Sequence, residues 1–161
     1  DLGPMCTAGG VATVQAQIED ALAKGVKLAC GGQKPAGAKF EKGHFFQPSI
    51  LRDVDHTMLV MREETFGPLV GVMPFDTLEE VIGLANDSPY GLAAICYTQS
   101  LSTAALMARK LEAGNVAINN VDAGVINAPD GGWKDSGFGH ERGPEGLYGY
   151  LHVEHVRTRT L

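Results

Sequence analysis

The sequence lacks the features that mark membrane proteins, secreted disulfide scaffolds and nucleic-acid-binding domains. No apolar run approaches the roughly 20 residues that a helix needs to cross a bilayer. The chain does not open with a basic segment followed by an apolar one, so we expect no secretory signal. The formal net charge is −6, and the longest basic cluster is the pair Arg157 and Arg159. We therefore expect neither a nucleic-acid partner nor a membrane partner.

Cysteine is scarce, and its pattern is uninformative for metal or disulfide chemistry. Cys6, Cys30 and Cys96 are widely spaced and form no CxxC pair, which predicts neither a disulfide framework nor a zinc site. A reducing, cytoplasmic setting is the expectation. Cys96 lies in an apolar run and is expected to be a small buried hydrophobe. No base or positive charge adjoins any of the three in sequence, so no catalytic thiolate is predicted here.

Histidine spacing gives no metal site either. His152 and His155 are three residues apart on an expected strand, so their side chains should point to opposite faces. They are not expected to chelate one ion. No metal-binding residue is predicted anywhere in the chain.

The size and composition that remain are those of a soluble globular protein. The chain has 161 residues, of which 44% are hydrophobic and 20% charged. This length suits one domain or part of a larger one, and such a chain buries about 68–70% of its unfolded surface. Because the sequence opens at Asp1 rather than at a methionine, we expect a processed chain or a piece of a longer one.

The first part of the chain predicts a helix, two strands and a long loop. Residues 11–24 have helical apolar spacing, and Gly25 is a plausible stop. Residues 26–30 predict a short strand, 31–43 a loop, and 45–51 a strand interrupted by its proline. The inward face of the helix is expected to carry Val11, Val14, Ile18, Ala21 and Leu22.

The middle of the chain alternates strands and helices. Apolar strands are predicted at residues 69–75, 92–98 and 115–119, and helices at 76–86 and 102–113. Apolar strands joined by helices favour right-handed crossovers and a parallel sheet covered on both faces. The expected fold class is therefore α/β, with a parallel βαβαβ sheet whose core lies between Leu69 and Asn119.

The ends of these helices carry recognisable signals. Asp76 and Glu79 have the spacing of a capping box at the start of the first one. Gly114 is the expected stop of the second.

The C-terminal part changes character. The segment "DGGWKDSGFGHERGPEG" carries many glycines, which suits backbone held close to another group. Pro144 is expected in the first turn of a short helix. Residues 151–161 alternate apolar and polar side chains and predict a final strand.

Two motifs compete for a functional interpretation. "GFGHERG" has the spacing GxGxxxG and follows no strand, so it does not qualify as a dinucleotide fingerprint. In "MREETFGPLV", the ordinary interpretation of Glu63 and Glu64 is a solvated acidic turn. A second interpretation is functional: Gly67 and the following proline are expected to fix a bend that presents Glu64 beside Phe66. A carboxylate accepts hydrogen bonds from vicinal hydroxyls such as those of ribose, and an aromatic packs against a flat ring.

Four motifs in register resemble one enzyme family. "REETFGPLV", "SPYGLAAICYT", "GNVAINN" and "APDGGWKDSGFGHERG" occur in the order and at the separations found in the NAD(P)-dependent aldehyde dehydrogenase superfamily. The resemblance covers nearly the whole chain and matches the C-terminal third or so of such an enzyme. It implies that residues 1–150 belong to the catalytic domain and that 151–161 form an oligomerisation strand.

The resemblance implies roles for two residues. The second glutamate of the family's E-E-x-F-G-P motif binds the nicotinamide-ribose hydroxyls, and its phenylalanine positions the nicotinamide. These positions are Glu64 and Phe66, so the implied cofactor is NAD or NADP, while Glu63 is expected to be structural. The family's nucleophilic cysteine and general-base glutamate lie upstream of this motif. No catalytic residue is therefore expected here, and the isolated chain is expected to be inactive.

The resemblance implies an aldehyde substrate, and a semialdehyde such as succinate semialdehyde is a family-level expectation. A carboxylate on the substrate would favour a nearby cation, and the last loop offers Lys134 and then Arg142. Many relatives carry an aromatic where Asp130 lies, which weakens substrate inference from this loop. The alternatives are a stand-alone, non-catalytic binding or assembly module and an unrelated nucleotide-binding α/β domain. The second is disfavoured because no glycine turn of the kind that cradles a phosphate follows a strand.

Overall fold

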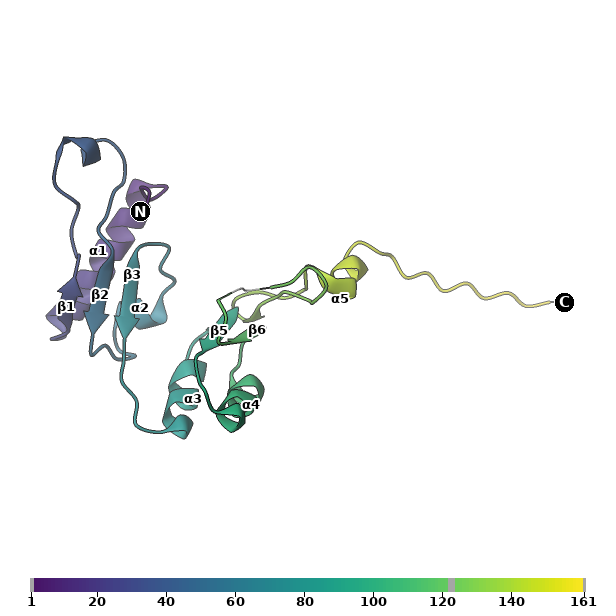
Figure 1. Ribbon diagram of the computed structural model, residues 1–161. Helices are drawn as coiled ribbons and strands as arrows, with labels where there is room; N and C mark the ends of the chain where they lie inside the picture. The colour runs from purple at the N-terminus through teal and green to yellow at the C-terminus, as the bar shows by residue number, and fades with distance from the viewer. Residues whose placement is uncertain (1, 122–123, 161) are drawn as a thin grey trace. The chain divides into compact units, whose positions relative to one another are not determined.

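The computed structural model describes residues 2–121 and 124–160 (Figure 1). The chain separates into two compact units, which we call the N-terminal unit, ending at Asp76, and the C-terminal unit, beginning at Thr77. Within the described residues, every helix is too short or too polar to traverse a bilayer.

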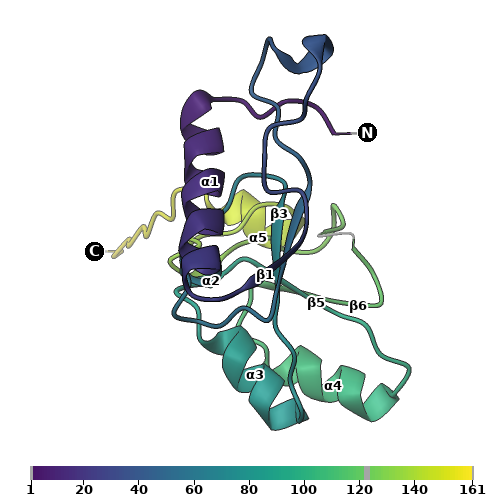
Figure 2. The same cartoon turned by 90° about the vertical axis from the view of Figure 1, so that its left-hand side faces the viewer.

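The N-terminal unit packs one long helix against a three-stranded sheet. The sheet order is β1-β2-β3, with β1 antiparallel to β2 and β2 parallel to β3. Helix α1 lies beside these strands (Figure 2). The elements of this unit are α1 (Ala8–Ala23), β1 (Lys27–Cys30), η1 (Ala38–Phe40), β2 (Ser49–Arg52), α2 (Leu59–Arg62) and β3 (Leu69–Val72).

Capping groups explain the bounds of α1. Thr7 is the N-cap, and its hydroxyl accepts a hydrogen bond from the Gly10 amide at 3.0 Å. The helix therefore begins earlier than residue 11. Gly25 follows the helix with a φ of 90°, as the stop signal predicted. The inward face is confirmed for Val14, Ile18 and Ala21, whereas the expectation for Leu22 is wrong because its side chain is 43% exposed.

The core of this unit forms between α1 and the inner face of the sheet. Strand β2 begins directly after Pro48 and alternates in burial, with Ser49 and Leu51 inward and Ile50 and Arg52 outward. The buried apolar cluster comprises Val14, Ile18, Ala21, Val26, Phe46, Leu51, Val54, Met58 and Leu69. This core therefore lies mostly N-terminal to the region between residues 69 and 119 where the sequence placed it.

The C-terminal unit contains the alternating strands and helices. Strands β5 and β6 are parallel and are joined by α4, while β4 and β7 are antiparallel. The elements are α3 (Leu78–Asn86), β4 (Tyr90–Gly91), β5 (Ala93–Cys96), α4 (Leu101–Lys110), β6 (Asn115–Ile118), β7 (Trp133–Lys134) and α5 (Gly143–Tyr148). Pro144 lies in the first turn of α5, as predicted.

The sheet arrangement differs from the expected all-parallel βαβαβ sheet. The α/β class holds, but the pairing is mixed, and β3 belongs to the N-terminal unit with β2 as its parallel partner. Strand pairing depends on contacts between distant segments, which apolar periodicity alone does not reveal.

Two predicted helix ends are wrong. The capping box of α3 uses Thr77 and Glu80, one residue after the predicted pair Asp76 and Glu79. The Thr77 hydroxyl accepts from the Glu80 amide at 3.1 Å, and the Glu80 carboxylate accepts from the Thr77 amide at 3.4 Å.

Helix α4 ends at Lys110 rather than reaching Gly114. Leu111 leaves the helical conformation, with a φ of −74° and a ψ of 130°. The next amide, from Glu112, donates to the side-chain oxygen of Asn86 at 2.9 Å. This bond ties the end of α4 to the end of α3 and replaces another helical turn.

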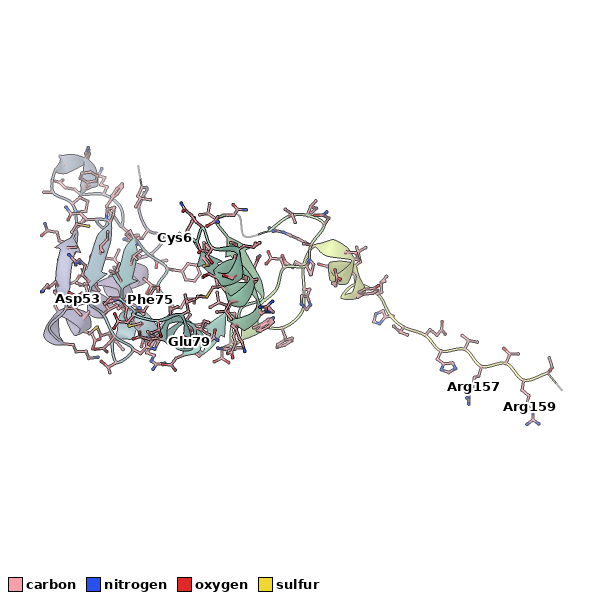
Figure 3. The ribbon with its side chains drawn as sticks, turned by 60° about the horizontal axis from the view of Figure 1, so that its bottom comes forward. Cys6, Asp53, Phe75, Glu79, Arg157 and Arg159 are labelled. Carbon is pink, nitrogen blue, oxygen red and sulfur yellow. The ribbon has the colours of Figure 1, made fainter. Side chains whose placement is uncertain are left out.

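The predicted C-terminal strand is not present in the single chain. Residues 151–160 form neither helix nor strand, and all are exposed. The α5 region ends with hydrogen bonds from the Tyr150 amide to Leu147 and from the Leu151 amide to Tyr148. Figure 3 shows Arg157 and Arg159 on this extended segment. A strand needs a hydrogen-bonded neighbour, and the described chain offers none here.

Candidate functional site

The candidate site is the loop of residues 63–68, "EETFGP", which joins α2 to β3. Glu63 ends α2: its amide donates to the Leu59 carbonyl at 2.8 Å, and its backbone is extended. Beyond it, Glu64 and Phe66 are exposed, while Thr65 between them is half-buried. The Phe66 ring is 81% exposed, so its faces are open to a flat partner.

The inner side of the loop is held by a hydrogen bond to α1. The Thr65 hydroxyl donates to Oε1 of Gln17 at 2.7 Å. Gln17 is fully buried and lies in the inward row of α1 between Val14 and Ile18. The side chain of Thr65 is therefore directed inward while its neighbours face outward.

The bend after Phe66 is fixed by close packing and by the start of the sheet. A Cβ added to Gly67 would lie 2.4 Å from Cγ2 of Val14 and 3.0 Å from Cε of Met5, so only glycine fits. The Pro68 carbonyl accepts from the Ser49 amide at 2.8 Å, which leads into the β2–β3 ladder. The chain thus bends at Gly67 and Pro68, and the bend is packed against α1 and joined to the sheet.

The three cysteines are free thiols and lie in different parts of the chain. Two of them are exposed: Cys30 and Cys6, which is labelled in Figure 3. Cys96 is half-buried, whereas the sequence predicted that it would be fully buried. The Cys30 sulfur donates to the Pro48 carbonyl at 3.8 Å. Across the residues that the structure describes, no group of three or more histidine, cysteine or acidic side chains could hold a metal ion.

Lys134, a cation that the sequence offered to a substrate carboxylate, caps a helix. Its ammonium group donates to the carbonyl oxygens of Asn86 at 2.7 Å and Ser88 at 3.2 Å, at the C-terminal end of α3. It also lies 2.7 Å from the Glu112 carboxylate. Lys134 therefore has three acceptors within the C-terminal unit.

Arg142 is likewise paired. Its Nη1 lies 3.3 Å from Oδ2 of Asp130, and the backbones of Asp130 and Glu141 exchange two hydrogen bonds of 2.9 and 2.8 Å. A Cβ on Gly124 would meet Nη1 of Arg142 at 2.0 Å, so Gly124 packs directly on this pair. Asp130 and Glu141 also line a cavity of about 370 Å³ beside the glycine-rich loop. Asp130, which the sequence analysis singled out in this loop, thus forms an ion pair with Arg142.

Comparison with known proteins identifies the class of protein. The profile of the aldehyde dehydrogenase family matches residues 1–156. The chain is 42% identical over 159 residues to succinate semialdehyde dehydrogenase of Acinetobacter baylyi, covering 97% of this chain and 32% of that protein. It is 43% identical over 162 residues to NADP(+) succinate-semialdehyde dehydrogenase 2 of Schizosaccharomyces pombe, covering 99% and 32%.

Solved structures agree. Betaine aldehyde dehydrogenase of Staphylococcus aureus in complex with NAD+ superposes with a TM-score of 0.92 at 38% identity, covering 97% of this chain and 31% of that one. A 3,6-anhydro-L-galactose dehydrogenase in complex with NAP gives a TM-score of 0.90 at 37% identity, covering 94% and 32%. The chain therefore belongs to the aldehyde dehydrogenase family. It spans about a third of the length of the curated relatives that it matches.

The structure leaves the two predicted site residues exposed. Glu64 and Phe66 both lie in the loop after α2, and Glu63, also exposed, is the C-cap of that helix. Sequence reasoning missed Gln17 and Thr65. A signal for Gln17 existed, because a polar residue at an inward helical position demands a partner; the identity of that partner was not readable from the sequence.

Proposed function

We propose that this chain supplies the nicotinamide-side cofactor contacts of an NAD(P)+-dependent aldehyde dehydrogenase. The observation that carries the proposal is the exposed pair Glu64 and Phe66, presented on a bend fixed by Gly67. A carboxylate has two oxygens that accept hydrogen bonds from vicinal hydroxyls, which matches a ribose. An exposed phenyl face beside it matches a planar nicotinamide.

In the complete enzyme, an aldehyde is oxidised to a carboxylic acid through a cysteine thioester. NAD(P)+, when bound, accepts the hydride. Glu64 would hold the ribose by charge-assisted hydrogen bonds, and Phe66 would pack against the nicotinamide ring. Together the two residues would restrict the orientation of the nicotinamide. The thiolate and the general base belong to parts of the enzyme outside residues 1–161. The cytoplasmic setting and a homo-oligomer formed through the C-terminal segment are parts of the same proposal.

A semialdehyde is the substrate class that we propose, which is supported by two relatives named for succinate semialdehyde. In this chain, however, Lys134 is bound to Glu112 and Arg142 to Asp130. A substrate carboxylate would have to compete with these acidic partners. We therefore propose that the cation for such a carboxylate is supplied by another part of the enzyme.

The adjacent glutamates provide a matched test in the complete enzyme. Glu64→Gln keeps one acceptor but loses the charge-assisted bonds to the ribose, worth ~1.5–3 kcal/mol, so the hydride step should slow by about ten- to a hundredfold. Glu63→Gln should have little effect, because this residue contributes its backbone to the end of α2. Stopped-flow measurement of the NAD(P)H burst separates the two. Equal effects at both positions would refute the assignment.

A further inference from the structure

The side chain beneath the cofactor loop is chemically unsuited to its surroundings. Gln17 is 0% exposed and occupies a row of α1 whose other buried members are apolar. Its Oε1 accepts from Thr65, but among the described residues its Nε2 has no hydrogen-bond partner. A buried, unpaired N–H loses its bonds to water without replacement, which destabilises the folded state. Core stability therefore does not explain a glutamine here.

The single bond that Gln17 makes acts on the loop. Thr65 is half-buried between the exposed residues Glu64 and Phe66, so a bond that holds its side chain inward restrains the backbone on both sides of it. At the far end of the loop, Gly67 packs against Val14. Without the hydrogen bond, the loop would sample more conformations and lose more entropy when it binds.

We propose that Gln17 and Thr65 are positioning residues that pre-orient Glu64 and Phe66, an inference that rests on the proposed function of that pair. Neither touches the cofactor. Gln17 retains an unpaired donor because its oxygen is the anchor of the loop. The cost in folding stability is offset by a binding loop that is ordered in advance.

The inference predicts opposite effects on stability and on cofactor use. In the complete enzyme, Gln17→Met removes both the anchor and the unpaired N–H while keeping a similar length. The midpoint of denaturant unfolding should stay the same or rise, whereas the KM for NAD(P)+ should increase by about two- to tenfold. A residue that served only the fold would lower the midpoint and leave the KM unchanged.

Thr65 supplies the reciprocal arm. Thr65→Val removes the hydroxyl at constant shape and should raise the KM for NAD(P)+ as Gln17→Met does. Thr65→Ser keeps the hydroxyl, so its KM should equal that of the unsubstituted enzyme. The double variant Gln17→Met with Thr65→Val should have a KM no higher than that of either single variant, because both substitutions remove the same bond.

The matched controls are Thr13→Val and Gln15→Met, which remove hydrogen bonds on the exposed side of α1. These should leave the KM unchanged.

Amide hydrogen exchange gives a readout that does not depend on turnover. Exchange in residues 63–67 should be faster in Gln17→Met and Thr65→Val than in the two controls. The inference is overturned if Thr65→Val changes neither the exchange nor the KM. If Glu64→Gln still slows the hydride step in that case, the proposed function stands. Normal behaviour of Glu64→Gln would overturn the proposed function itself, and the inference with it.

Discussion

The ammonium group of Lys134 lies 2.7 Å from the carboxylate of Glu112, and both residues adjoin the C-terminal end of α3. The carbonyl of Asn86 accepts from Lys134 at 2.7 Å, and the side-chain amide of Asn86 donates to the Lys110 carbonyl at 2.8 Å. A helix C-terminus carries partial negative charge and unpaired carbonyls, which a cation satisfies. Lys134 thus joins β7, α3 and the segment after α4.

Replacing Lys134 by methionine should destabilise the C-terminal unit by about 1–2 kcal/mol, because two backbone carbonyls lose a charged donor. Denaturant unfolding of the chain would measure this. Lys110→Met, at an exposed position in the last turn of α4, is the control and should cost less than half as much. Equal losses in the two variants would contradict the capping role.

Apolar periodicity predicted the helices and the parallel strands of the C-terminal unit, because that signal is local to each element. It did not predict the role of Lys134, since a charge in a glycine-rich loop has no periodic context. It also missed the bond between Gln17 and Thr65. Those residues are 48 positions apart in the chain, and only the tertiary fold of the N-terminal unit brings them together.

Acid should weaken the N-terminal unit through Asp20. The Lys24 ammonium group, and then the Leu59 amide at 2.9 Å, donate to the Asp20 carboxylate and hold its pKa below the ordinary aspartate range. Hydrogen bonds from the Thr57 hydroxyl and amide lower the pKa of Asp55 in the same way. A carboxyl whose folded pKa lies below its unfolded pKa stabilises the fold above the unfolded value, and this contribution is lost as the pH falls through the folded value.

The unfolding midpoint of the chain should therefore decrease as the pH falls below about 4. Asp20→Asn should reduce that decrease, because asparagine does not titrate. Glu19→Gln, at an exposed neighbouring position, is the matched control and should retain the full pH dependence. Thermal unfolding followed by circular dichroism between about pH 6 and 3, a range that includes the ordinary carboxylate values, would measure the change. Identical pH profiles for Asp20→Asn and the unsubstituted chain would contradict this account.

The isolated 161-residue chain should not oxidise aldehydes. The resemblance places the nucleophilic cysteine and the general base in other parts of the enzyme, and removing such groups typically reduces turnover by several orders of magnitude. Incubation with aldehyde and NAD+ or NADP+, followed by absorbance of the reduced cofactor, tests this. Turnover by the purified chain that disappears in Cys6→Ala or Cys30→Ala would overturn the prediction.

The C-terminal segment should pair with another copy of the enzyme. Residues 151–160 are extended and exposed, and Leu151, Val153 and Val156 place apolar side chains in water, with Val153 99% exposed. Unpaired N–H and C=O groups along extended backbone are a template for strand addition, and burial of these side chains would add a hydrophobic contribution. Deletion of residues 151–161 should therefore lower the oligomeric state. The parallel pair β5–β6 should persist, because its hydrogen bonds lie within residues 93–118. Light scattering of intact and truncated chains measures the masses, and circular dichroism checks that the truncated chain stays folded. Equal masses would show that this segment has no role in assembly.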